Sequence, residues 1–85
     1  MKTVRWHFLK NERLKKLRGV GFEDILGWNH IQTLQHPLKS YEQIMLYERN
    51  GRIWAVPIVE TEREIVLKTL YPSRKFTKMY KQGRL

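Results

Sequence analysis

The sequence contains no cysteine among its 85 residues. Neither a disulfide framework nor a thiolate metal site can therefore stabilise the fold, and nothing points to an oxidising compartment. Long hydrophobic runs are also missing, and charged residues lie between the aromatic ones at the N-terminus, so we expect neither a signal peptide nor a membrane span. The composition predicts a cytoplasmic protein with no membrane partner, folded as one domain over residues 1–85.

Acidic residues are scarce at both ends of the chain. Residues 1–18 hold seven basic side chains and one acidic one, and residues 68–85 hold six basic side chains and no acidic one. Residues 19–67, in contrast, hold four basic and seven acidic side chains. The formal net charge is +9. If the two ends lie together, as they often do in small domains, they form one basic face. Such a face favours nucleic acid or an acidic protein as the partner.

The first half of the chain predicts a strand and two short helices. Residues 3–8 alternate in the manner of a strand, and residues 12–18 form a short amphipathic pattern that Asn11 would cap and Gly19 would end. A second helix is expected over residues 21–26. Residues 32–40 have little periodicity and indicate a strand fragment followed by a loop.

The second half predicts a hairpin and a further strand. Asn50-Gly51 is the favoured pair for a type I′ turn and lies between two apolar runs, residues 44–49 and 52–56. Pro57 lacks a ladder donor, so we expect a bulge there. Alternation over residues 65–71 puts Lys68 on a largely apolar face. The order β-α-α-β-β-β-α predicts an α+β fold with a small antiparallel sheet, two N-terminal helices and a short C-terminal helix.

The last helix contains an electrostatic conflict. Ser73 is a good N-cap, which puts Arg74 and Lys75 in the first turn, where the helix already carries partial positive charge. A phosphate bound by that turn and by both side chains would offset the repulsion. The alternative is a solvated basic face with no role.

Several short motifs, in this order, resemble the BrnT-like toxins of bacterial toxin–antitoxin pairs, which are relatives of the RelE-type ribonucleases. The motifs surround the hairpin and cover nearly the whole chain: Trp6, Asn11, Leu14, Arg18-Gly19-Val20, Phe22-Glu23-Asp24, Arg74-Lys75-Phe76-Thr77 and Tyr80. The resemblance implies a compact sheet with two N-terminal helices and a ribonuclease activity that stops translation. It also implies a cognate small antitoxin, of the ribbon-helix-helix type, encoded beside the toxin, and the ribosome as a possible partner.

The chain departs from the commoner family pattern at two places. The family's first helix commonly ends in a His before its glycine, whereas this chain has Arg18, so the resemblance implies phosphate binding there and not proton transfer. After the last strand the family commonly has Ser-Ala-Arg-Arg-Ala-Thr. Here the basic pair Arg74-Lys75 aligns, and its neighbours differ.

Cleavage of RNA needs no metal or other cofactor, because the substrate's own 2′-hydroxyl is the nucleophile. The protein must orient that group, stabilise charge on the phosphate and move protons. Arg74 is the first candidate for the phosphate clamp, because its guanidinium is always charged and can bond two oxygens at once. Desolvation on its strand face would let Lys68 transfer protons, unless it extends to solvent. The candidate catalytic residues are Arg74, Lys75, Lys68, His36 and Tyr80.

Further basic and aromatic side chains are candidates for RNA binding: Trp6, Lys10, Lys15, Arg18, Lys78 and Lys81. Some candidates of both kinds also have a plainer structural reading. Trp6 and Tyr80 can be core residues, and His36 can be structural. The three histidines are not spaced as a metal set, so no metal site is expected. The rival hypothesis is a non-catalytic nucleic-acid-binding module, or an inactive toxin that serves as a complex partner. A DNA-binding repressor is less favoured, because no helix-turn-helix pattern is present.

Overall fold

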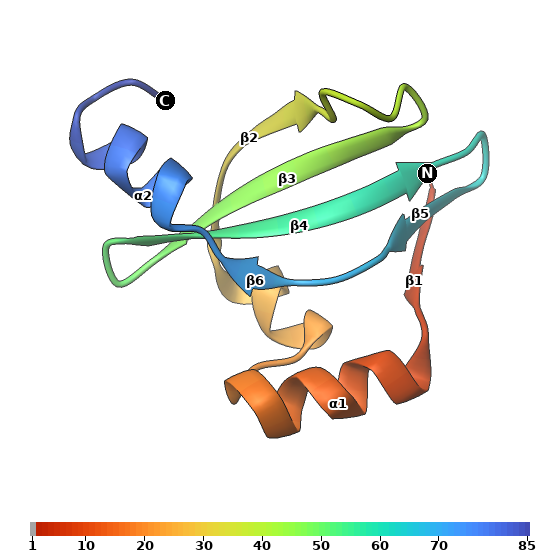
Figure 1. Ribbon diagram of the computed structural model, residues 1–85. Coiled ribbons are helices and arrows are strands. Elements are labelled where there is room, and N and C mark those ends of the chain that lie inside the picture. The colour runs from red at the N-terminus through yellow and green to blue at the C-terminus, as the bar shows by residue number, and fades with distance from the viewer. Residues whose placement is uncertain (1) are drawn as a thin grey trace.

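The computed structural model describes residues 2–85 and has an α+β fold, as predicted (Figure 1). One six-stranded sheet has the order β1-β5-β4-β3-β2, and β6 pairs with β4 beyond the end of β5. No helix in residues 2–85 is long and apolar enough to cross a membrane. The elements are β1 (Thr3–Trp6), α1 (Phe8–Arg18), the 3-10 helix η1 (Phe22–Gly27), β2 (Asn29–Gln35), β3 (Glu42–Arg49), β4 (Arg52–Glu60), β5 (Glu64–Leu67), β6 (Tyr71–Pro72) and α2 (Arg74–Lys81).

The predicted hairpin is confirmed and forms the centre of the sheet. β3 and β4 pair without interruption from Glu42 opposite Val59 to Arg49 opposite Arg52. Asn50 and Gly51 have φ values of 54° and 79°. A type I′ turn requires positive φ at both central residues, and Asn and Gly are the residues that tolerate it most readily.

The alternation of β4 builds two cores, one on each face of the sheet. Trp54 and Val56 point to the face that α1 and η1 cover, where they join a buried cluster that includes Phe22. Ile53 points to the other face, where Phe76 of α2 packs against its cluster. The two helices that carry the basic residues therefore lie on opposite faces.

The predicted bulge at Pro57 is wrong, and the structure shows why the proline is tolerated. Pro57 lies directly opposite Ile44 in regular register. Its carbonyl points away from β3 and accepts a bond from the Lys68 amide at 2.9 Å. Because N–H and C=O of one strand residue point to the same side, the missing donor leaves the β3–β4 ladder intact. The register shift lies in β2, between His30 and Gln32.

The missing donor at Pro57 coincides with a break in the neighbouring strand. The single strand predicted over residues 65–71 is wrong: β5 ends at Leu67 and β6 begins at Tyr71. Leu67 and Leu70 are both buried in the same core, which strict alternation would not allow. Lys68 is consequently exposed rather than on an apolar face.

The sheet is mixed, because β1 pairs with β5 in parallel while the other neighbours are antiparallel. Paired residues of the two strands, such as Thr3 and Glu64, are 61 positions apart in the chain, so no hairpin connects them. The expectation of a wholly antiparallel sheet is therefore wrong in this one pairing. The strand prediction over residues 3–8 is too long by two residues at its end, and the fragment expected at 32–40 is the strand Asn29–Gln35.

Helix α1 starts earlier than predicted, with His7 and not Asn11 at its N-cap. Asn11 is 4% exposed, and its side chain accepts a bond from the Phe22 amide at 2.7 Å while donating one to Glu23 at 2.7 Å. A Cβ at Gly21 would lie 2.7 Å from Asn11 Oδ1, so glycine is required for this close approach. The second predicted helix exists as the 3-10 helix η1.

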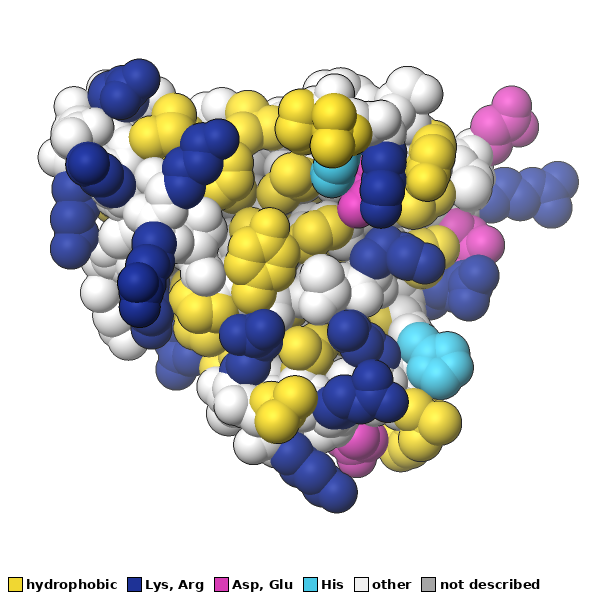
Figure 2. Space-filling view, viewed as in Figure 1, with side chains coloured by type: hydrophobic (Ala, Val, Ile, Leu, Met, Phe, Trp, Pro, Cys, Tyr) yellow, Lys and Arg dark blue, Asp and Glu magenta, His cyan; other side chains and the backbone are white. Residues whose placement is uncertain are grey.

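The two ends of the chain lie at opposite ends of the sheet in Figure 1, so the single basic face expected for adjacent termini is not formed. Figure 2 shows the basic side chains in separate groups, one over α2 at the left and another over α1 below. No acidic side chain is visible among the group over α2. The basic surface at α2 is therefore separate from the one at α1.

Candidate functional site

Three hydrogen bonds anchor helix α2 at its start. Ser73 caps it as predicted, with its hydroxyl accepting from the Phe76 amide at 3.1 Å. The Thr77 hydroxyl donates to the Ser73 carbonyl at 2.6 Å and accepts from the Ile53 amide at 2.9 Å, which attaches the helix to β4. These bonds fix the direction in which the charged side chains of α2 leave the sheet.

A basic groove lies between α2 and the start of β4. We call it the α2 groove; it has a volume of about 340 Å³ and is lined by Arg52, Arg74, Thr77, Lys78, Lys81 and Gln82. Four of the six lining residues are cations, and none is an acid. Such a groove attracts anions, because like charges gathered at one place raise the local potential.

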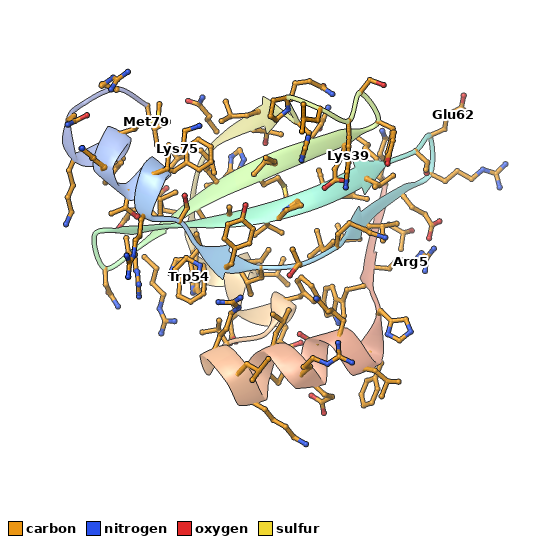
Figure 3. The ribbon with its side chains drawn as sticks, viewed as in Figure 1. Arg5, Lys39, Trp54, Glu62, Lys75 and Met79 are labelled. Atoms are coloured by element: carbon orange, nitrogen blue, oxygen red, sulfur yellow. The ribbon has the colours of Figure 1, made fainter. Side chains whose placement is uncertain are left out.

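A second hollow lies on the other side of α2. We call it the His36 hollow; it has a volume of about 480 Å³ and is lined by Leu34, Gln35, His36, Pro37, Ile44, Tyr71, Ser73, Lys75 and Phe76. Figure 3 shows Lys75 on α2. Its ammonium lies 5.6 Å from the centre of the Phe76 ring. The lining of the hollow includes one cation (Lys75), one imidazole (His36) and one phenol (Tyr71), and most of the other lining side chains are apolar.

The imidazole of His36 is oriented by its own loop. Its Nδ1 accepts bonds from the Leu38 and Lys39 amides at 3.1 and 3.2 Å. An accepting Nδ1 carries no proton, so the neutral ring carries its hydrogen on Nε2. This geometry leaves the Nε2 hydrogen of His36 free to be donated to a ligand oxygen.

Arg74 and Lys75 are adjacent in sequence but line different hollows. Successive helix residues point about 100° apart, and Arg74 lines the α2 groove while Lys75 lines the His36 hollow. Of the predicted residues, Lys78 and Lys81 join Arg74, and His36 joins Lys75. The structure thus divides the predicted basic helix into two surfaces.

Tyr80 lines neither hollow. Its alternative reading as a core residue is wrong, because Tyr80 is 36% exposed. Phe76 supplies the contact of α2 with the core instead.

Trp6 and Lys68 lie together in a different hollow, at the β1–β5 edge, with Arg5, His7 and Phe8. Trp6 is half-buried, and its ring packs against Phe22 at a centroid distance of 5.7 Å. Arg18 on α1 is exposed and Lys10 is half-buried. None of these four predicted residues is close enough to α2 to line its hollows.

Lys15 is occupied by acidic neighbours. Its ammonium lies 2.7 Å from Glu23 and 3.4 Å from Glu12. The hydrogen bond to Glu23 is the main reason that the pKa of Lys15 is raised, and the same bond lowers the pKa of Glu23. Lys15 therefore supports the α1–η1 junction. It is a poorer candidate for RNA binding than the cations of α2, which have no acidic partner within residues 2–85.

Arg52 lines the α2 groove and Tyr71 lines the His36 hollow, but neither was among the predicted site residues. The signal for Arg52 was present, because it directly follows the Asn50-Gly51 turn at an end of the sheet. The signal for Tyr71 was its position just before the basic helix. Neither signal reveals that α2 packs beside these two residues, and the hollows exist only because it does.

No group of three or more potential metal ligands of the His, Cys, Asp or Glu type lies together in residues 2–85. The side chains at α2 that can donate hydrogen bonds are cations, an imidazole and hydroxyl groups. This set matches an anionic ligand.

Comparisons with known proteins give one informative match. No protein-family model and no curated protein matches the sequence. Among solved structures, the crystal structure of the ribonuclease toxin BrnT of Brucella abortus matches with a TM-score of 0.60, over 86% of this chain and 97% of that chain. The fold is similar to that of BrnT. The predicted resemblance is therefore confirmed as a likeness of fold, at 18% sequence identity.

Proposed function

We propose that this protein is a metal-independent endoribonuclease toxin that cleaves RNA, foremost messenger RNA, and so inhibits translation in the cytoplasm. The observation that carries the proposal is the arrangement at α2, where the His36 hollow and a groove of four cations lie on either side of one helix. The likeness of fold to BrnT, a ribonuclease toxin, supports the same reading. A small antitoxin, of the ribbon-helix-helix type, is the proposed partner.

The proposed reaction uses the 2′-hydroxyl of RNA as the nucleophile. Its proton passes to solvent, the O2′–P bond forms, and the P–O5′ bond breaks to leave a 2′,3′-cyclic phosphate. Lys75 neutralises charge on the phosphate and gives one ammonium proton to the departing O5′, then regains it from water. His36 donates a hydrogen bond from Nε2 to a phosphate oxygen. Arg74 binds an adjoining phosphate from the groove side. Lys68 and Tyr80 have no part in this scheme.

The test is induction of the protein from a tightly repressed promoter, followed by growth and by the integrity of messenger RNA. We expect wild type to stop growth and cleave RNA, and Lys75→Ala to lose at least one order of magnitude in the rate of RNA cleavage, since an electrostatic contact to the transition state is commonly worth that much. Arg74→Ala should lose activity as well, chiefly through weaker substrate binding. Intact RNA and normal growth with the folded wild-type protein would contradict the proposal.

The rival function is a nucleic-acid-binding module without catalysis. The α2 groove favours it as much as it favours an enzyme, because cations alone suffice for binding. Purified protein incubated with labelled RNA separates the two. An enzyme yields 5′-hydroxyl and cyclic-phosphate products that Lys75→Ala does not form, whereas a module retards the RNA and leaves it whole.

A further inference from the structure

Within residues 2–85, the four cations of the α2 groove lack the acidic partners that some basic residues at the other end of the sheet have. At the other end of the sheet Lys2 pairs with Glu60 and Arg5 with Glu64, and Lys39 lies 3.7 Å from Glu42. In residues 2–85 no ion pair involves Arg52, Arg74, Lys78 or Lys81. Mutual repulsion among these four charges is thus unrelieved in the free protein.

Arg52 adds a second local conflict. In the hairpin register it lies directly opposite Arg49. Like charges directly opposite each other destabilise an antiparallel pair. Arg49 reaches over the Trp28 ring, 5.0 Å from its centre, whereas Arg52 lines the α2 groove. The hairpin therefore tolerates an unfavourable pair and, in doing so, supplies a guanidinium to the groove from outside α2.

The shape of the charge distribution favours a strand of phosphates over a single anion. Arg74, Lys78 and Lys81 follow a spacing of four and then three residues, so they form one stripe along the helix. Seven residues of α-helix rise about 10 Å. A stripe of this length can contact more than one phosphate of a single strand.

The lining also favours nucleic acid over an acidic protein. Stable protein interfaces are centred on apolar or aromatic anchors. The α2 groove presents no large apolar side chain, because its lining residues are Arg52, Arg74, Thr77, Lys78, Lys81 and Gln82. Guanidinium groups also match phosphate oxygens two at a time, which suits recognition of a sugar–phosphate backbone without reading its bases.

We infer that the α2 groove is a binding subsite for the phosphate backbone of RNA outside the reacting nucleotide, with Arg52 and Arg74 as its principal ligands. The inference rests on the proposed RNA substrate but not on cleavage. One strand then crosses the start of α2, with its reacting phosphate in the His36 hollow and neighbouring phosphates in the groove. Loss of a groove cation should raise KM and leave kcat nearly unchanged, whereas loss of Lys75 should lower kcat.

The experiment measures binding of a fluorescein-labelled, single-stranded 2′-O-methyl RNA, which has no free 2′-hydroxyl and cannot be cleaved. Fluorescence anisotropy gives Kd at a series of salt concentrations for wild type, Arg52→Gln and Arg74→Gln. The matched control is Arg63→Gln, which removes the same charge from an exposed position beside Glu62, at the end of the molecule far from α2 (Figure 3). Each groove variant should weaken binding about fivefold or more. Each should also lower the salt slope of log Kd by about 0.7, the contribution of one phosphate contact in a single strand.

The results separate this inference from the proposed function. Tight binding that depends on Arg52, together with no cleavage of unmodified RNA, would uphold the subsite and contradict the enzyme. Equal loss of affinity in Arg63→Gln would show that only overall charge matters, and would overturn the subsite. Competition by polyglutamate as strong as competition by RNA of equal charge would also overturn it, in favour of an acidic protein.

Discussion

At the scale of single residues, Asn11 has more influence on the structure than its sequence context suggests. It resembles an N-cap, yet it lies inside α1 and joins that helix to η1 through the Phe22 amide and the Glu23 carboxylate. Phe22 is fully buried, so its amide has no access to water. A buried donor without an acceptor is expensive, which makes this amide the most sensitive point of the junction.

We expect Asn11→Ala to lower the free energy of unfolding by about 1–3 kcal/mol, because the Phe22 amide then loses its acceptor. Urea denaturation followed by circular dichroism measures the change. Asn11→Asp is the informative control: it keeps the acceptor for Phe22 but sets a second carboxylate beside Glu23. An Asn11→Ala variant as stable as wild type would mean that water or another group replaces the acceptor.

At the scale of elements, α1 and α2 differ in how they begin. Ser73 caps α2 with its hydroxyl, whereas His7 at the start of α1 makes no capping bond with its side chain. No acid lies in the first turn of α1. The first turn of α1 thus has neither of the two common sources of stability at a helix N-terminus, a capping oxygen and a negative charge.

Replacing His7 by Asp should therefore stabilise the protein. The backbone at His7 is already extended, with φ −80° and ψ 126°, as an N-cap requires. We expect a gain of about 1 kcal/mol from the capping bond and the favourable helix dipole. Thermal unfolding of wild type, His7→Asp and His7→Ala tests it, since Ala removes the imidazole without adding a cap. Equal melting temperatures for Asp and Ala would refute the capping argument.

At the scale of the whole molecule, the net charge of +9 is distributed so that the two basic helices lie on opposite faces of the sheet. Distance reduces repulsion between the two groups, since charges more than about 10 Å apart at the surface are largely screened at 0.1 M salt. Repulsion within each group remains. The free protein should therefore be less stable in dilute buffer than at physiological salt.

We expect the melting temperature to rise by several degrees between 20 and 200 mM sodium chloride, equivalent to about 1 kcal/mol for a domain of this size. The double variant Arg13→Glu, Lys16→Glu changes two exposed residues on α1 and lowers the net charge by four. Its melting temperature should depend less on salt. A wild-type melting temperature that falls with salt would show that ion pairs such as Lys15–Glu23 outweigh the repulsion.

The candidate site could be predicted only in part. Helix α2 with its Ser73 cap and cationic first turn is a local feature, and its existence is confirmed. The division of its residues between two hollows depends on the position of His36 in the β2–β3 loop and of Arg52 in the hairpin. Those positions are 20 to 40 residues away in the chain, so no local pattern reports them.

Features that depend on neighbouring residues follow directly from the local sequence. Asn50-Gly51 determined the hairpin, because few other pairs accept positive φ twice in succession. Tertiary structure alone decided the parallel pairing of β1 with β5, the exposure of Lys68 and the meeting of His36 with Lys75. The physical reason is that local hydrogen bonds and steric preferences act over a few residues, whereas burial of two cores selects among many long-range pairings that are locally equivalent.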